Sequence, residues 1–174
     1  MQDIVEKASR IRLVIFDVDG VLTDGNLYLG NNGEELKTFN IKDGLGIKLL
    51  MQSGVEVGII TGRSSKLVAQ RMENLGVKYI YQGQHKKLPA YQDLLAKLEL
   101  ESEQVAYVGD DLIDLPLMRR TGFSVAVKDA HSLVKQHAHW QTPSVGGRGA
   151  VREVCEFLMK AQGTLDEAYQ AYLE

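Results

Sequence analysis

The chain has 174 residues, of which 44% are hydrophobic and 25% charged, and its formal net charge is −3. This composition is typical of a globular domain large enough to bury a core, and we expect one domain over residues 1–174. The negative balance disfavours nucleic acid as a partner, and apolar runs of only strand length predict no membrane partner. A single cysteine, Cys155, and no apolar leader at the start favour the reducing cytoplasm.

The first predicted strand covers residues 13–16, an apolar run without polar alternation that is typical of a strand buried on both faces. Asp17 and Asp19 follow where this strand ends, and Gly20 permits a sharp turn after them. Ligands of open α/β sheets bind outside the carboxyl ends of the strands. We therefore expect Asp17, at the strand end, to meet solvent and a substrate instead of the core.

Residues 25–40 predict a β-hairpin that projects beside the two acids. Its strands are expected at residues 26–29 and 35–39, around turn-forming residues at 30–33. A helix follows over about residues 45–50, with Asp43 as its expected N-cap. This stretch leaves no room for a cap domain, so the site is predicted to be open unless a neighbouring subunit covers it.

The rest of the chain alternates between strand and helix patterns. Strands are expected at residues 55–60, 79–81, 105–108 and 123–127. Helices are expected at about 65–75, 89–98, 115–119, 151–159 and 164–173. The alternation predicts an α/β fold, a doubly wound, Rossmann-like parallel sheet with helices on both faces.

Polar residues follow four of these strands: Asp17 with Asp19, Thr61, Lys87, and Asp110 with Asp111. Because parallel strands end at one edge of their sheet, we expect these side chains to cluster. Carboxylates that crowd together stay ionised only around a cation, and oxygen ligands in a small site suit Mg²⁺. A hydroxyl and an ammonium group beside them would surround a phosphoryl group, whose transfer depends on positioning and charge stabilisation.

The four motifs, in this order and over nearly the whole chain, resemble those of the haloacid dehalogenase superfamily of phosphatases. The resemblance implies that Asp17 is the nucleophile and forms an aspartyl-phosphate. It implies that Asp19 protonates the leaving group and then activates the attacking water. Mg²⁺ would be held by Asp17, by the backbone carbonyl of Asp19 and by Asp110.

The resemblance also assigns supporting roles. Asp111 and Asp114 would be outer-shell acids of the metal site. Thr61 and Lys87 would bind the phosphoryl oxygens, with the adjacent Lys86 as the alternative lysine because this motif rests on spacing alone.

Longer stretches resemble the 3-deoxy-D-manno-octulosonate 8-phosphate phosphatase family, a group of capless homotetramers that serve lipopolysaccharide core synthesis. The matching residues are 17–25, 40–48, 62–63, 109–116 and 146–153. The resemblance implies hydrolysis of that ester to the free sugar acid and phosphate. It also implies a set of substrate contacts, some from a neighbouring subunit: Asn40, Lys42, Asp43, Gly44, Lys48, Arg63, Arg71, Lys87 and Arg148.

A sugar carboxylate remote from the phosphate would need cations of this kind, although composition alone favours Lys48 and Arg71 as residues of solvated helix faces. Nine-carbon sugar acid 9-phosphate phosphatases share the capless plan and are the nearest alternative. Arg63 and Asn74 favour the eight-carbon substrate, because the nine-carbon phosphatases resemble sequences with an acidic residue at the position of Arg63 and a basic residue at that of Asn74.

Two non-enzyme alternatives remain, a receiver-like phospho-acceptor domain and an oligomerisation domain. In receiver domains the paired acids come first in the chain and the phospho-accepting Asp lies in mid-chain. In this chain the proposed acceptor, Asp17, comes first and the paired acids, Asp110 and Asp111, come last. The histidines at 131, 137 and 139 are predicted to be exposed loop residues without a metal.

Overall fold

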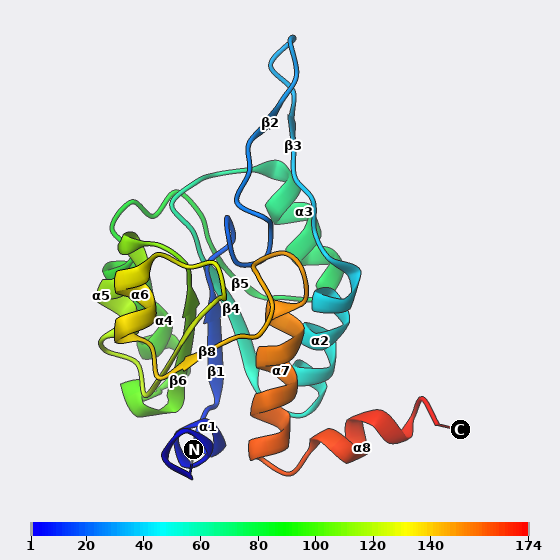
Figure 1. Cartoon of the computed structure of the whole chain (residues 1–174), viewed down its shortest axis with the longest axis vertical. Helices are drawn as coiled ribbons and strands as arrows, with labels where there is room; N and C mark the ends of the chain where they lie inside the picture. Colours follow the sequence, from blue (N-terminus) through cyan, green and yellow to red (C-terminus); the bar gives the residue numbers. More distant parts are fainter. Residues whose placement is uncertain (1, 174) are drawn as a thin grey trace.

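The structure is a computed structural model that describes residues 2–173. Six parallel strands form one sheet in the order β5-β4-β1-β6-β7-β8 (Figure 1). Their bounds are β1 Leu13–Phe16, β4 Glu56–Ile60, β5 Tyr79–Tyr81, β6 Val105–Gly109, β7 Phe123–Ala126 and β8 Trp140–Gln141. The predicted doubly wound parallel sheet is confirmed.

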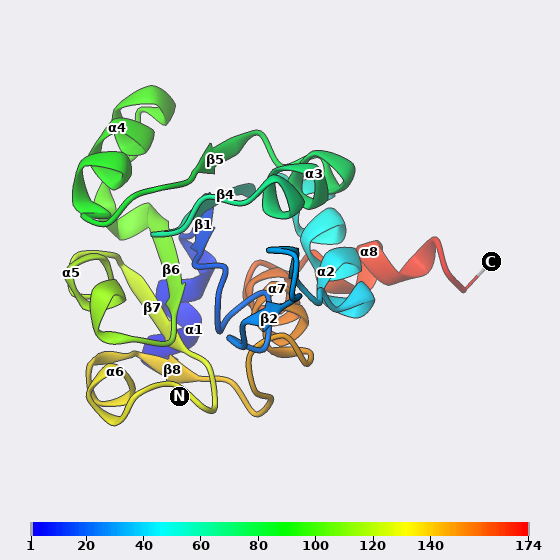
Figure 2. The ribbon, with the colours of Figure 1, turned by 90° about the horizontal axis from the view of Figure 1, so that it is seen from above.

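Helices cover both faces of the sheet, and the view from above separates the two layers (Figure 2). One layer contains α1 Gln2–Ser9, α2 Ile41–Gln52, α3 Lys66–Leu75 and α7 Ala150–Ala161. The other contains α4 Leu88–Leu98, α5 Leu115–Met118 and α6 Ser132–His137, with the 3₁₀ turns η1 Ser102–Gln104 and η2 Leu112–Asp114 nearby in the chain. The last helix, α8 Leu165–Gln170, extends away from the end of α7. No helix within residues 2–173 combines the length and apolar character needed to cross a membrane.

The core is centred on β1, whose four residues are completely buried between the two helical layers. This explains its uniform apolar run, because a strand with helices on both faces has no solvent side to carry polar residues. From β1 the chain passes to α2 in one layer, and from β6 it passes to α5 in the other. The carboxyl ends of these neighbouring strands therefore form the switch point at which α/β sheets bind ligands.

A two-stranded hairpin rises from this edge of the sheet (Figure 1). Its strands are β2 Tyr28–Leu29 and β3 Glu35–Leu36, with Tyr28 paired to Leu36. The predicted strands at 26–29 and 35–39 were too long. Regular pairing ends at Leu36, and the next residue, Lys37, turns its side chain toward the body of the protein.

The N-cap predicted for α2 was also wrong. Asn40 caps this helix, since its side chain accepts the backbone N–H groups of Lys42 and Asp43 at 2.8 and 3.3 Å. Asp43 lies inside the helix and is buried, where it accepts the N–H groups of Arg152 at 2.8 Å and Gly149 at 3.3 Å. A tertiary contact with the start of α7 therefore determines its role.

The short elements α6 and β8 were not predicted. Strand β8 pairs with β7 through Trp140 and Val125. It has only two residues, too few to show the alternation of side chains by which a strand is recognised in a sequence. His131 and His137 lie at the two ends of α6 and not in a loop, although both are exposed as expected. His139 lies in the bend before β8 and is exposed as well.

Candidate active site

Three carboxylates meet at the carboxyl edge of β1 and β6. Asp17 directly follows β1, Asp110 follows β6, and Asp114 comes from η2, and their ligand oxygens all lie within 4.8 Å of one another. Asp17 and Asp114 are buried, so Asp17 reaches the pocket but does not stand in open solvent as expected. The described residues offer no hydrogen bond to Oδ1 of Asp110, which is also buried. A buried carboxylate oxygen without a partner beside two other acids fits a divalent cation with oxygen ligands.

Glycine at position 20 is required for this geometry. Its φ of +93° is a conformation that side chains rarely adopt, and a Cβ atom there would lie 2.1 Å from Oδ2 of Asp110. The turn after β1 can therefore approach the end of β6 only because it carries no side chain at Gly20.

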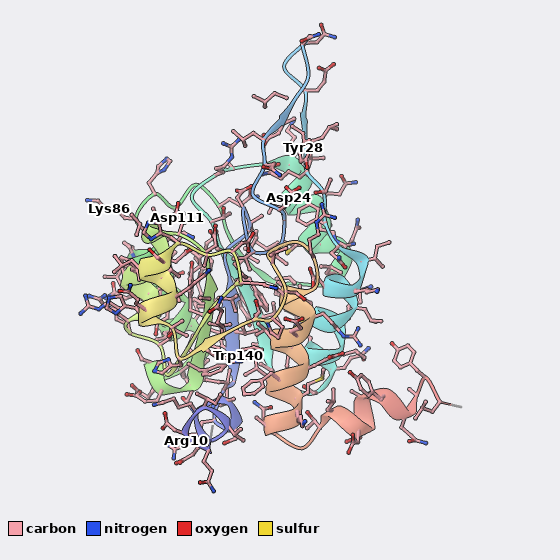
Figure 3. All side chains as sticks on the ribbon, viewed as in Figure 1. Arg10, Asp24, Tyr28, Lys86, Asp111 and Trp140 are labelled. Atoms are coloured by element: carbon pink, nitrogen blue, oxygen red, sulfur yellow. The ribbon has the colours of Figure 1, made fainter. Side chains whose placement is uncertain are left out.

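Lys87 lies among these acids with its side chain fully buried. Its ammonium nitrogen is 2.9 Å from Oδ1 of Asp17 and 2.7 Å from Oδ1 of Asp114. The hydroxyl of Tyr107 lies 3.1 Å from the same nitrogen and donates to Oδ1 of Asp114 at 2.7 Å. The adjacent Lys86 is exposed and extends outward (Figure 3), so the geometry favours Lys87 as the lysine of the motif.

Asp114 connects the lysine to the metal-binding end of β6. Its Oδ2 accepts the backbone N–H groups of Asp110 at 2.9 Å and Asp111 at 3.2 Å, while its Oδ1 serves Lys87 and Tyr107. Asp111 is itself exposed and caps η2. These contacts agree with a supporting role for both acids, and the buried Asp114 also lies close enough to Asp17 and Asp110 to share a cation with them.

Burial and mutual repulsion perturb the acids strongly. Burial, followed by the charge of Asp114, raises the pKa of Asp17 to about 7 against the opposing effect of Lys87. Burial and the charges of Asp114 and Asp17 raise the pKa of Asp110 to about 8. Burial lowers the pKa of Lys87, but the Asp114 and Asp17 carboxylates outweigh it, so that this pKa lies above its usual value. A cation bound among these carboxyl groups would favour their ionised forms and lower their pKa values.

A pocket of about 250 Å³ opens above the acids. Asp17 and Asp110 lie in its wall, and Thr61 follows β4 into the same space, as predicted from the strand ends. The remaining lining residues are Asp19, Gly25, Gly62, Arg63, Asp111 and Ile113. The structure therefore brings together all the predicted catalytic and metal-binding residues, with Lys87 beneath Asp17.

Asp19 is held from the hairpin side of the pocket. Lys37, which follows β3, forms an ion pair with Oδ1 of Asp19, and its side chain is only 2% exposed. Its ammonium nitrogen also lies 3.4 Å from Oε1 of Glu35. Glu35 pairs in turn with Arg63 at 3.0 Å, so a chain of charges connects the hairpin to two walls of the pocket.

The predicted sugar-acid contacts are distributed more widely. Asn40, Asp43, Gly44 and Arg71 lie together where α2 meets α3, and the Arg71 guanidinium lies over the Phe39 ring at 6.0 Å. These residues are separate from the pocket wall that contains Asp17. They form one group in the fold, but their contact with a substrate stays a prediction.

Three other predicted contacts fall in different places. Lys42 is exposed on the first turn of α2, and Arg148 is exposed in the segment before α7, beside Asp24 at the base of the hairpin. Lys48 lines a depression with Glu56, the first residue of β4, and is therefore at the opposite edge of the sheet from Asp17. Within one chain the structure does not bring Lys48 to the acids, which leaves a neighbouring subunit's site as its predicted place of contact.

Two residues of this site, Tyr107 and Lys37, were not predicted from the sequence. Tyr107 places a hydroxyl at the centre of β6, a strand that is buried at every position. Because a buried tyrosine hydroxyl needs a hydrogen-bond partner, a tyrosine in this otherwise aliphatic run could have indicated a polar contact. Lys37 gave no such signal, because lysine is common on exposed hairpins.

The fold and the acid centre define a hydrolase of the haloacid dehalogenase type, and the family of haloacid dehalogenase-like hydrolases matches over residues 78–154. The chain is 59% identical to the 3-deoxy-D-manno-octulosonate 8-phosphate phosphatase KdsC of Escherichia coli (strain K12), over 95% of this chain and 88% of that protein. A crystal structure of the Yersinia pestis phosphatase matches with a TM-score of 0.93 and 55% identity, over 94% of this chain and 89% of that one.

Another solved structure, the phosphatase from Moraxella catarrhalis in complex with magnesium ion, phosphate ion and KDO, matches with a TM-score of 0.96 and 44% identity. The match covers 100% of this chain and 99% of that chain. The chain belongs to the family of 3-deoxy-D-manno-octulosonate 8-phosphate phosphatases. The resemblance expected from the motifs is thereby confirmed.

Proposed function

We propose that this chain is a Mg²⁺-dependent phosphatase that hydrolyses 3-deoxy-D-manno-octulosonate 8-phosphate to the free sugar acid and phosphate, in lipopolysaccharide core synthesis. The observation that carries the proposal is the buried centre of Asp17, Asp110, Asp114 and Lys87 below an open pocket at the switch point of the sheet. The high identity to phosphatases that carry this substrate in their names supports the choice of ester.

In the proposed reaction, Asp17 attacks the phosphorus and takes the phosphoryl group as an aspartyl-phosphate. Asp19 protonates the sugar oxygen as its bond to phosphorus breaks, and later removes a proton from the water that hydrolyses the intermediate. Lys87 keeps Asp17 oriented through their 2.9 Å contact and offsets negative charge as the phosphoryl group arrives. Thr61, in the pocket wall, is placed to bind a phosphoryl oxygen.

Mg²⁺ would be held by Asp17, Asp110 and the backbone carbonyl of Asp19, with Asp111 and Asp114 as supporting acids. The unpartnered Oδ1 of Asp110 supports this choice. When bound, Mg²⁺ supplies charge neutralisation for the carboxylates and the phosphoryl oxygens.

The test is a phosphate-release assay with the eight-carbon ester and a nine-carbon sugar acid 9-phosphate, each with Mg²⁺ and with a chelator. We expect the eight-carbon ester to be preferred by at least about 10-fold in kcat/KM, since Arg63 and Asn74 favour it, and no release with the chelator. A preference for the nine-carbon ester would establish the alternative substrate. A phospho-protein that accumulates without turnover of any ester would establish the receiver-like alternative.

We also propose that the chain, a single domain over residues 1–174, acts as a homotetramer in the cytoplasm. Leu27, Leu29 and Leu36 are exposed on the hairpin, which is unusual for three large apolar side chains unless another molecule covers them. Lys48 is remote from Asp17 of its own chain, so the substrate contact predicted for it would need a neighbouring copy. Leu29→Glu should shift sedimentation toward smaller species and raise KM for the eight-carbon ester, and a fully active wild-type monomer would contradict the shared site.

A further inference from the structure

Lys37 is a buried cation whose partners lie in the proposed active site. Its side chain is 2% exposed although it comes from the hairpin, most of whose residues face solvent. A lysine buried to this extent is normally paired with an acid, because an isolated charge away from water is costly. Here the paired acid is Asp19, which makes Lys37 a neighbour of the proposed proton carrier.

We propose that Lys37 is a positioning residue that holds Asp19 for proton transfer to the leaving group. The inference rests on the proposed phosphatase function and goes beyond it, because it assigns a role to a residue outside the four motifs. Lys37 pairs with Oδ1 of Asp19, which leaves Oδ2 for a substrate in the pocket that Asp19 lines. A carboxylate with one oxygen anchored presents the other in a fixed direction, which proton transfer requires.

The second contact of Lys37 links this position to the hairpin. Glu35 lies 3.4 Å from the same ammonium nitrogen and is also paired with Arg63 across the pocket. Glu35 keeps Arg63 as a second partner, whereas the ion pairs of the described residues give Asp19 only Lys37, so moving this lysine away would leave the Asp19 carboxylate without its cation. The hairpin is thus a support for the proton carrier as well as a boundary of the pocket.

A change of leaving group separates positioning from general structural support. The sugar alcohol of 3-deoxy-D-manno-octulosonate 8-phosphate must be protonated as it departs, whereas the phenolate of para-nitrophenyl phosphate departs as a stable anion. The parameter to compare is kcat/KM, because it reports the steps up to the departure of the leaving group and excludes the later attack of water.

For Lys37→Met we expect kcat/KM for the sugar acid ester to fall by about 10- to 100-fold, part of the usual contribution of acid catalysis. We expect kcat/KM for para-nitrophenyl phosphate to fall by less than about 3-fold. Lys37→Arg retains the cation and should lie within about 5-fold of the wild type on both esters. The matched control is Lys160→Met, the same substitution at an exposed residue near the end of α7, which should leave both values unchanged.

Equal losses on both esters, or no loss on either, would overturn the positioning role. A Lys37→Arg protein as slow as Lys37→Met on the sugar acid ester would overturn the requirement for charge. If Lys37→Met does not fold, as judged by circular dichroism and melting temperature, the Arg variant carries the comparison. A wild-type protein that releases phosphate from neither ester would instead contradict the proposed function, so the two failures are distinguishable.

Discussion

The acid centre and the hairpin lie side by side at the carboxyl edge of the sheet, but they are held by different interactions. Asp17, Lys87 and Asp114 are buried and bonded to one another by short contacts and by backbone N–H groups of the strand ends. The hairpin has two residues in each strand, and side-chain pairs such as the 2.6 Å hydrogen bond from Tyr28 to Asp24 attach it to the body (Figure 3).

This difference predicts different sensitivities. Removing one partner of a buried ion pair costs about 3–5 kcal/mol, because the other charge stays behind without water. An exposed pair such as Arg63 with Glu35 contributes much less, because water screens both charges and each side chain loses freedom on pairing. The centre is therefore suited to chemistry that needs fixed geometry, and the outer hairpin to contacts that can exchange with a ligand. Lys37 is the exception, a residue of the hairpin whose side chain is buried like those of the centre.

The largest effect is expected at the nucleophile. Asp17→Asn should lower kcat by at least about 10⁴-fold, because the amide cannot form the covalent intermediate. The folded state should persist, since asparagine has nearly the same shape. Asp93→Asn, at an exposed acid of α4, is the matched control and should retain full activity. Steady-state phosphate release measures both, and normal turnover by Asp17→Asn would move the nucleophile elsewhere.

The next largest effect is expected at the buried lysine. Lys87→Met should lower kcat by about 10²- to 10³-fold and destabilise the metal-free protein by about 3 kcal/mol, because Asp17 and Asp114 lose their shared cation. Lys86→Met is the matched control, an adjacent exposed lysine with the same substitution. Steady-state kinetics and chemical denaturation should both detect a loss in Lys87→Met and none in Lys86→Met. A greater loss in Lys86→Met would reverse the assignment of this motif.

Metal binding should depend on pH in a defined direction. In the unfolded chain Asp17 and Asp110 have the usual aspartate pKa of 3.8, whereas in the folded state their pKa values are about 7 and about 8. The folded state therefore binds more protons between about pH 4 and pH 8, so the metal-free protein loses stability as pH rises through this window. Mg²⁺ competes with those protons and should stabilise the protein more at about pH 8 than at about pH 5.5.

Thermal melting with and without Mg²⁺ measures this effect. At about 100 times its dissociation constant a ligand stabilises by about 2.7 kcal/mol, which corresponds to roughly 5–10 °C for a chain of this length. Asp110→Asn is the control and should abolish the shift. An equal Mg²⁺ shift at both pH values would show that the cation does not displace protons from these acids.

The smallest effect is expected at the hydroxyl of Tyr107. Tyr107→Phe keeps the ring in the core but removes the group between Lys87 and Asp114, which should lower kcat by about 10-fold and stability by about 1 kcal/mol. Tyr91→Phe removes a comparable buried hydroxyl, one bonded to Ser102 at 3.1 Å. It should cost similar stability but no activity. Similar kinetic losses in both variants would mean that Tyr107 contributes only to packing.

The residues that could be predicted from the sequence share one property: their positions are set by the residues next to them in the chain. The run before Asp17 is apolar at every position because β1 is covered on both faces, and the acids follow where burial ends. The same pattern before Thr61 and Asp110 places their side chains at one edge, because parallel strands end together. The sheet and the pocket wall follow from these local signals.

Tertiary structure alone decided the contacts between distant segments. Asp19 meets Lys37 across 18 residues, and Asp43 meets Gly149 across 106, pairings that no local period encodes. Packing also separated Lys87 from its neighbour Lys86, since only one of two adjacent lysines can enter the core. The sequence by itself thus determined which acids stand at the edge of the sheet. The partners that orient those acids depend on the folded arrangement, because buried charges take whichever opposite charge the packing brings within reach.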